Sequence, residues 1–196
     1  RREYINVVEK SKIGYDWVRG VGKNYEGLIK VELARLEMDK DKQIATLKGA
    51  AADMEDGMSN CRRWIQSRPP VISQIATVAG FEDELGETLN KLYLLIQDKE
   101  ILQRANEVYE DAAQKFKKVN LPSRAAESYW RIAENQNRMG ESKKAAEDFE
   151  RASVEYDVAA QRIPHFVEFF QDYSTYMKSW SEIEKAKFAH QHEEYV

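Results

Sequence analysis

The chain has few of the residues that cross-link, interrupt or bend a polypeptide. Its 196 residues include four prolines, nine glycines, three histidines and one cysteine, Cys61. A lone cysteine excludes an intrachain disulfide and a zinc site built from several thiolates. A chain without disulfides is typical of a reducing compartment, so we expect a cytoplasmic protein. We expect Cys61 itself to be a small buried hydrophobic residue.

Long apolar runs and a strong net charge are also missing. No segment approaches the roughly 20 apolar residues that a membrane-spanning helix needs, so only a peripheral role at a membrane is left open. The net charge of −4 and the pI near 5.6 create no overall attraction for nucleic acid, and no nucleic-acid partner is expected. Because the chain begins with Arg-Arg instead of Met and ends inside a helical pattern, we expect a trimmed chain or a fragment of a longer protein.

Known catalytic and cofactor-binding motifs are absent. The sequence has no phosphate-binding loop, no dinucleotide-binding fingerprint and no nucleophile elbow. His190 and His192 would point about 200° apart on a helix, so they do not easily share one metal ion. We therefore expect no metal, no cofactor and no catalytic activity. Two alternatives stay open: a helical-bundle enzyme with a polar cavity, and a nucleic-acid-binding repeat that uses Arg62, Arg63 and Arg68.

What is present is helix-forming sequence along the whole chain. Ala, Glu, Lys, Leu, Arg and Gln dominate between the breaks, and the alternating pattern of strands is missing. We predict an all-α protein of about nine or ten helices. The predicted helices cover about residues 3–19, 23–38, 41–67, 82–97, 99–118, 123–139, 141–161, 164–179 and 181–195, with 71–80 as a short helix or a connector.

Particular residues define the predicted breaks and the first helices. The glycines at 20–22 are expected to end the first helix, Asp41 to cap the third, and the region of Trp180 to separate the last two. Gly140 is expected to end its helix in the left-handed conformation. The first predicted helix has a candidate buried stripe at Tyr4, Val7, Val8, Tyr15 and Val18, and the second gathers Tyr25, Leu28, Ile29, Leu33 and Leu36 on one side.

One segment repeats another that lies 40 residues earlier. The matched positions are Ala105, Tyr109, Ala112 and Phe116 in the first copy and Ala145, Phe149, Ala152 and Tyr156 in the second. Alanine lets two helix axes approach closely, and the aromatic residue fills the space beside it. A helical hairpin cannot bury its apolar faces alone, so hairpins stack on one another. We predict one repeat domain over residues 1–196, with N-terminal helices in 1–68 and hairpins in 69–196.

The same segment resembles a known helical repeat. The tetratricopeptide-repeat signature is matched at Tyr129, Ile132, Ala133, Gly140, Ala145, Phe149 and Ala152. Gln136 and Asp157 depart from that signature, and the period is longer than usual. Longer hairpins of this kind resemble the tetratricopeptide-like stacks of soluble NSF attachment proteins, best over residues 89–156. The resemblance implies antiparallel hairpins stacked as a right-handed solenoid, and a non-repetitive helical bundle is the alternative.

The resemblance also implies a non-catalytic adaptor that binds a peptide or helix of a partner protein. The first helix of each hairpin would line the binding groove, with Trp130 either a contact residue or packed between hairpins. The implied groove residues are Glu127, Trp130, Glu134, Asn137 and Arg138, with Asn90 and Leu94 in the preceding repeat. Self-association and a peripheral role in membrane trafficking stay open. The aromatic stripe from Phe166 to Trp180 is expected to be buried, with an exposed partner surface as the alternative.

Overall fold

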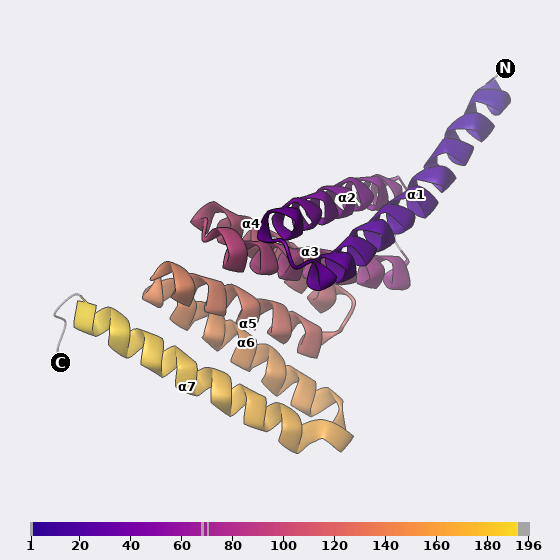
Figure 1. Cartoon of the computed structure of the whole chain (residues 1–196). Helices are drawn as coiled ribbons and strands as arrows, with labels where there is room; N and C mark the ends of the chain where they lie inside the picture. The colour runs from indigo at the N-terminus through magenta and orange to yellow at the C-terminus, as the bar shows by residue number, and fades with distance from the viewer. Residues whose placement is uncertain (1, 68, 70, 192–196) are drawn as a thin grey trace. The chain divides into compact units, whose positions relative to one another are not determined.

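The computed structural model describes the backbone of residues 2–67, 69 and 71–191, and side chains from Tyr15 onward (Figure 1). The predictions for Tyr4, Val7, Val8, Arg68 and His192 lie outside the described side chains, as does the predicted helix over 193–195. Within the described residues the secondary structure is helical, with seven α-helices, one short 3-10 helix and no strand. The prediction of an all-α fold is therefore confirmed, although the helices are fewer and longer than predicted.

The helices pack into two compact units, residues 1–98 and 99–196. The first unit contains α1 (Arg2–Leu36), α2 (Lys40–Gln66) and α3 (Ile72–Ile96). The second contains α4 (Lys99–Lys118), α5 (Pro122–Met139), α6 (Ser142–Arg162), the 3-10 helix η1 (Pro164–Phe166) and α7 (Val167–Gln191). Whether the chain forms one repeat domain stays a prediction.

Helix α1 runs without a break through residues 20–22, so the predicted helix end there is wrong. The reason is the packing of α1 against α2 at its glycines. A Cβ atom on Gly20 would lie 2.7 Å from the carbonyl oxygen of Gly57, and one on Gly27 would lie 2.9 Å from that of Ala50. The close approach of the two helices requires these glycines, and it outweighs their low helix propensity. The rings of Trp17 and Trp64, 6.3 Å apart, pack at the far end of this hairpin.

The start of α2 and the middle of α3 also differ from the predictions. Asp39, not Asp41, is the N-cap of α2: its carboxylate accepts hydrogen bonds from the backbone N–H groups of Asp41 and Lys42 at 2.9 and 3.1 Å. Asp41 instead supplies an acidic side chain to the first turn. Helix α3 joins the uncertain segment 71–80 to the predicted helix 82–97, because Gly80 lies in its interior and not at a turn.

In the second unit, successive helices pack beside one another, and the predicted alanine and aromatic residues form the core. Ala145, Phe149, Ala152 and Tyr156 are all buried, as are their counterparts in α4. Gly140 ends α5 with a φ of 83°, as predicted. Figure 1 shows α5, α6 and α7 running side by side.

Helix α7 continues through Trp180, so the predicted break there is wrong. Its sequence contains neither proline nor glycine, and nothing in it competes with helix formation. The Trp180 ring stacks on Phe149 of α6 with the ring centroids 5.9 Å apart. The aromatic stripe from Phe166 of η1 to Trp180 of α7 is only partly buried: Phe170 and Met177 are in the core, whereas Phe166, Phe169 and Tyr176 are about half exposed.

Arg151 of α6 connects three helices of the second unit. Its guanidinium donates to the Glu110 carboxylate of α4 at 2.6 Å and lies 3.8 Å from the ring centre of Tyr129 in α5. The Gln114 side chain donates to the Tyr129 hydroxyl at 3.1 Å. These contacts fix α5 between its neighbours, and α5 carries most of the predicted groove residues.

The close contact between α1 and α2 at their glycines predicts that alanine substitutions at two glycines change the free energy of unfolding in opposite directions. Gly27→Ala should lower the free energy of unfolding by about 1–3 kcal/mol, since the added methyl group meets the backbone of α2. Gly80→Ala is the matched control, because its Cβ meets nothing within 4 Å. It should raise the free energy of unfolding by up to about 1 kcal/mol through helix propensity alone. Urea-induced unfolding followed by circular dichroism measures both, and a stabilising Gly27→Ala would contradict the close approach.

The Arg151 contacts predict a pH-dependent contribution from Glu110. Burial acts to raise the pKa of Glu110, but hydrogen bonds from Arg151 and Gln114 outweigh it and hold the pKa below its ordinary value of 4.5. A lowered folded-state pKa stabilises the fold above the unfolded-state pKa, and this contribution disappears as the pH falls through the folded-state value.

Glu110→Gln should therefore lower the free energy of unfolding at pH 7 by about 0.5–1 kcal/mol, a modest value because the ion pair is partly exposed to solvent. The difference from the wild type should vanish at a pH well below 4.5. Glu182→Gln, which breaks an exposed ion pair with Lys185 in the same unit, should change little at any pH. A Glu110→Gln difference that is independent of pH would show that charge is not its cause.

Candidate functional site

A hollow of about 200 Å³ lies between α5 and α7, with α6 behind it. Four residues of the predicted groove line it from α5: Trp130, Glu134, Asn137 and Arg138. Their spacing of three and four residues places them on one face of the helix. The other lining residues are Phe149 of α6 and Tyr176 and Trp180 of α7. The structure thus brings together four of the seven predicted residues, and it adds three that the prediction did not include.

Aromatic rings form the walls of this hollow and hold one another in place. The Trp130 ring lies 5.9 Å from Tyr173 and 6.1 Å from Tyr176, both on α7. Trp180 continues the row, 6.2 Å from Tyr176. Offset and edge-to-face pairs at these distances stabilise the arrangement beyond simple burial. Trp130 therefore both packs between helices and faces the hollow, so the two interpretations of this residue are compatible.

Polar side chains surround the aromatic walls. The Lys187 ammonium donates to the Asn137 side-chain oxygen at 3.4 Å and to the buried Glu184 carboxylate at 2.6 Å. On α5, the Glu134 carboxylate accepts from Arg131 at 3.4 Å. These bonds place charged groups of both signs at the rim. A rim of this kind around an aromatic centre is the usual anatomy of a protein-interaction surface.

The buried side chain of Asn135 orients Arg138 at the rim of the hollow. Asn135 has no solvent exposure, and its side-chain oxygen accepts a hydrogen bond from Arg138 at 3.3 Å. The same side chain donates to the Asn106 oxygen of α4 at 2.9 Å. Arg138 is thus tied through Asn135 to the neighbouring helix, which restricts the rotamers of a long side chain before any partner binds.

The predicted groove did not include Tyr176, Trp180 or Lys187, although the first two belonged to the aromatic stripe whose alternative role was an exposed partner surface. The expected helix break at Trp180 was the cause, because it placed Tyr176 and Trp180 at a helix end and Lys187 on another helix. The absence of glycine and proline from 167–191 was the signal for one continuous helix that runs beside α5.

The remaining predicted groove residues lie elsewhere. Glu127 is on α5 but does not line the hollow, and its carboxylate pairs with Arg124 at 3.2 Å. Asn90 and Leu94 belong to α3 in the first unit. Leu94 lines a different hollow of about 340 Å³, whose other walls come from α1, α2 and Lys91 and Leu95 of α3. Their assignment to one groove with Trp130 stays a prediction.

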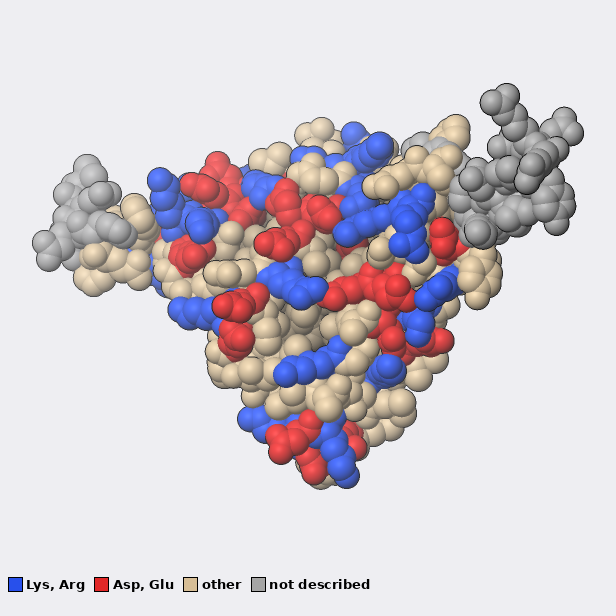
Figure 2. Space-filling model, turned by 90° about the horizontal axis from the view of Figure 1, so that it is seen from above, with Lys and Arg blue, Asp and Glu red and all other residues tan. Residues whose placement is uncertain are grey.

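The arginine cluster near the end of α2 takes part in ion pairs within the first unit. Arg62 donates to the fully buried Glu82 carboxylate at 2.7 Å, and Arg63 lies 3.7 Å from Asp16. Figure 2 shows basic and acidic residues interspersed over the face that it presents. Cys61 beside this cluster is buried, as predicted, and burial raises the pKa of its thiol to about 11. These contacts give no support to a phosphate-binding surface on α2.

Two features are missing from the part of the chain that the structure describes. Among those residues, no group of three or more His, Cys, Asp or Glu side chains is arranged to hold a metal ion. No helix there has both the length and the apolar character that crossing a membrane would require.

Comparison with known proteins gives one family. The family described as "Soluble NSF attachment protein, SNAP" matches residues 83–191, a range that includes part of α3 and all of α4 to α7. No curated protein matches the chain.

The chain is also loosely similar to two solved helical structures. One is titled "DHF58 filament", with 13% identity and a TM-score of 0.49, and the other is the de novo designed helical repeat protein DHR64, with 16% identity and a TM-score of 0.41. Each alignment covers 92% of this chain and 99% of the other. Likenesses this loose carry no inference.

The family match includes the hollow between α5 and α7 and its whole aromatic wall. It spans 109 of the 196 residues, which is more than half of the sequence. The chain belongs to the soluble NSF attachment protein family.

Proposed function

We propose that the chain is a protein-interaction adaptor that binds a segment of a partner protein in the hollow between α5 and α7. The observation that carries the proposal is the convergence of Trp130, Tyr176 and Trp180 on one space with charged groups at its rim. Tryptophan, tyrosine and arginine are the residue types that contribute most to binding energy at protein interfaces. All of them are present here together.

The size of the hollow supports a protein partner over a small molecule. Its volume of about 200 Å³ is below the roughly 300–1,000 Å³ of typical ligand pockets. It suits one large side chain of a partner, with the rest of the segment lying along α5 and α7. The rim then selects the partner by charge, because Glu134 and Arg138 present opposite signs on the same helix.

Preorganisation supports the same function. The aromatic rings contact one another across α5, α6 and α7, and Asn135 restrains Arg138. Little conformational entropy is then lost when a partner binds. The family name describes attachment to NSF, so an NSF-type protein is the first partner to test, in keeping with a cytoplasmic, peripheral role in membrane trafficking.

Substitution of Trp130 tests the proposal. Peptides selected from a random display library on the wild-type chain should bind Trp130→Ala at least about thirtyfold more weakly, the loss typical of a central aromatic residue. Isothermal titration calorimetry with the same peptides measures the change. Binding to a purified NSF-type protein should weaken in parallel if that protein uses this surface.

Two further variants separate binding from folding. Arg138→Glu reverses a rim charge without removing an aromatic ring, so it should weaken the binding of acidic peptides while the far-ultraviolet circular dichroism stays unchanged. Val154→Ala is the control, since this apolar side chain is 53% exposed on α6 and does not line the hollow. The proposal fails if Trp130→Ala and Arg138→Glu bind every selected peptide as tightly as Val154→Ala does.

A further inference from the structure

The outer face of α1 exposes an unusual row of large apolar side chains. Tyr15 and Val18 were predicted to be buried, and the structure corrects this: both are more than 60% exposed. The row continues along the same helix with Tyr25, Ile29, Leu33 and Leu36, each more than half exposed. Contiguous apolar surface of this extent on a folded chain usually marks an interaction site.

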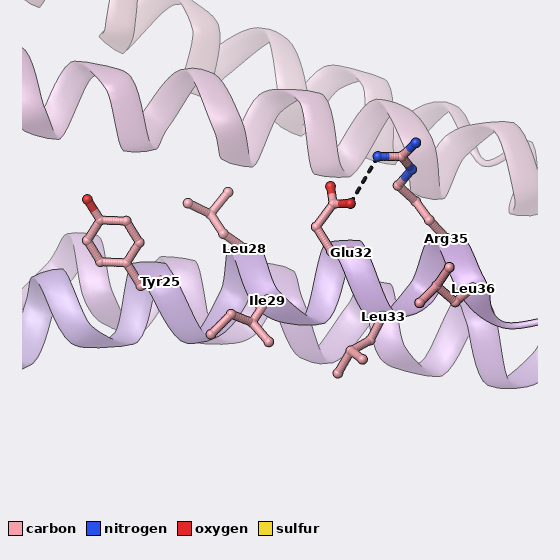
Figure 3. A pocket seen from close by; sticks show the side chains of 7 residues that line it. All are labelled: Tyr25, Leu28, Ile29, Glu32, Leu33, Arg35 and Leu36. Atoms are coloured by element: carbon pink, nitrogen blue, oxygen red, sulfur yellow. Dashed lines mark hydrogen bonds and ion pairs between the residues drawn. The ribbon is translucent and has the colours of Figure 1, made fainter.

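Most of the row fits the spacing of a coiled-coil seam, in which a and d positions alternate at intervals of three and four. Five of its six residues fall on the a and d positions 15, 18, 22, 25, 29, 32 and 36, whereas Gly22 and Glu32 occupy the other two and Leu33 takes an e position. An open groove of about 540 Å³ runs along this face. Its seven lining residues, Tyr25, Leu28, Ile29, Glu32, Leu33, Arg35 and Leu36, all occupy a, d, e or g positions of that pattern. In Figure 3, Tyr25 and Leu28 lie on one side of the groove and Ile29 and Leu33 on the other.

The opposite face of α1 is already occupied within the unit. Gly20, Gly27 and Ala34, at the f positions, are buried, and the two glycines meet α2. The a and d face is therefore the side left for another helix. We infer that α1 pairs with α1 of a second copy of this chain as an antiparallel coiled coil, centred between Lys23 and Asn24.

Packing along the seam favours this antiparallel pairing. In an antiparallel pair each a residue faces a d residue of the other helix. In the proposed register Gly22 faces Tyr25 of the second copy, and a Cβ on Gly22 would meet nothing within 4 Å in the single chain. The tyrosine ring, which packs edge-on against Phe81 of α3 in its own chain and is 56% exposed, covers that space with its outer face. Val18 faces Ile29 in the next layer, which joins two apolar side chains of complementary size.

Charge also favours the antiparallel pairing. Glu32 at a d position faces Tyr15, whose hydroxyl group can donate to the carboxylate, whereas a parallel pair would place Glu32 against Glu32. At the flanking e positions Arg19, which lies 3.8 Å from Asp56 in its own chain, faces Glu26 of the second copy, whose carboxylate accepts from Lys23 at 2.6 Å. The pair occurs twice by symmetry. A shift by one heptad in either direction would bring Arg19 against Arg19 or Glu26 against Glu26. The register is thus set by charge as well as by size.

The same charges disfavour a membrane as the occupant of this face. Glu26 and Glu32 lie along the apolar row and are exposed, ion-paired with Lys23 and Arg35, and burying these charged groups in lipid would cost free energy. The seam is also separate from the hollow between α5 and α7, since it belongs to the first unit. The inference therefore does not depend on the proposed function.

Sedimentation equilibrium at increasing protein concentration tests the pairing. The wild-type chain should form dimers, and Ile29→Lys should raise the dissociation constant at least about thirtyfold, since it places two charges in the seam of each dimer. Val154→Lys, at an apolar position on α6 that is 53% exposed compared with 61% for Ile29, should leave the dimer unchanged. Glu26→Arg should weaken the dimer roughly tenfold, and Arg19→Glu combined with Glu26→Arg should restore it.

Cross-linking tests the orientation. A tagged Tyr15→Cys chain mixed with an untagged Glu32→Cys chain should give the mixed product with a short thiol-specific cross-linker, because like positions would lie about 25 Å apart along the antiparallel pair. The buried Cys61 should stay unreactive. Like-with-like products would indicate a parallel pair and overturn the inference. A wild-type chain that stays monomeric overturns it as well. So does a monomer that floats with phosphatidylserine vesicles in an Ile29-dependent manner, because that outcome assigns the face to a membrane.

Discussion

The packing of alanine beside an aromatic ring is the interaction on which the second unit depends. Ala145 and Ala152 have no exposed surface, and Phe149 between them is buried as well. Because the alanines let neighbouring helices come close, the Phe149 ring reaches Trp180 of α7 and stacks on it. Together with the contacts of Trp130 and Tyr156 with the rings of α7, this stack places α7 beside α5 and forms the hollow between them. The first unit uses glycine in the same way, since Gly20 and Gly27 let α1 meet the backbone of α2.

The fold could be predicted from the sequence where local signals and packing agree. The helix over Lys99–Lys118 was predicted with its observed bounds, and Gly140 ended its helix as expected, because a left-handed residue marks that turn. The prediction failed at residues 20–22, where glycine serves a helix crossing and not a turn. Sequence alone does not distinguish these two uses of glycine, since the difference lies in a partner helix more than 30 residues away.

The candidate site was predicted in part for a similar reason. Trp130, Glu134, Asn137 and Arg138 follow from the spacing of a single helix, and the structure places them together. Tyr176 and Trp180 meet them from α7, and no periodicity within α5 indicates which helix lies opposite. The apolar row on α1 illustrates the same limit. Its spacing correctly indicates a stripe, but the side that becomes buried is decided by the glycines that face α2.

The distribution of tryptophan gives each unit its own optical reporter. The chain has four tryptophans, and they fall in two pairs. Trp17 and Trp64 are in contact within the first unit, while Trp130 and Trp180 both line the hollow of the second. Indole emission depends on local polarity, and nearby indoles exchange excitation energy. Replacing one pair with phenylalanine would leave fluorescence that reports on the other unit alone, so the order in which the two units open could be followed in an unlabelled chain.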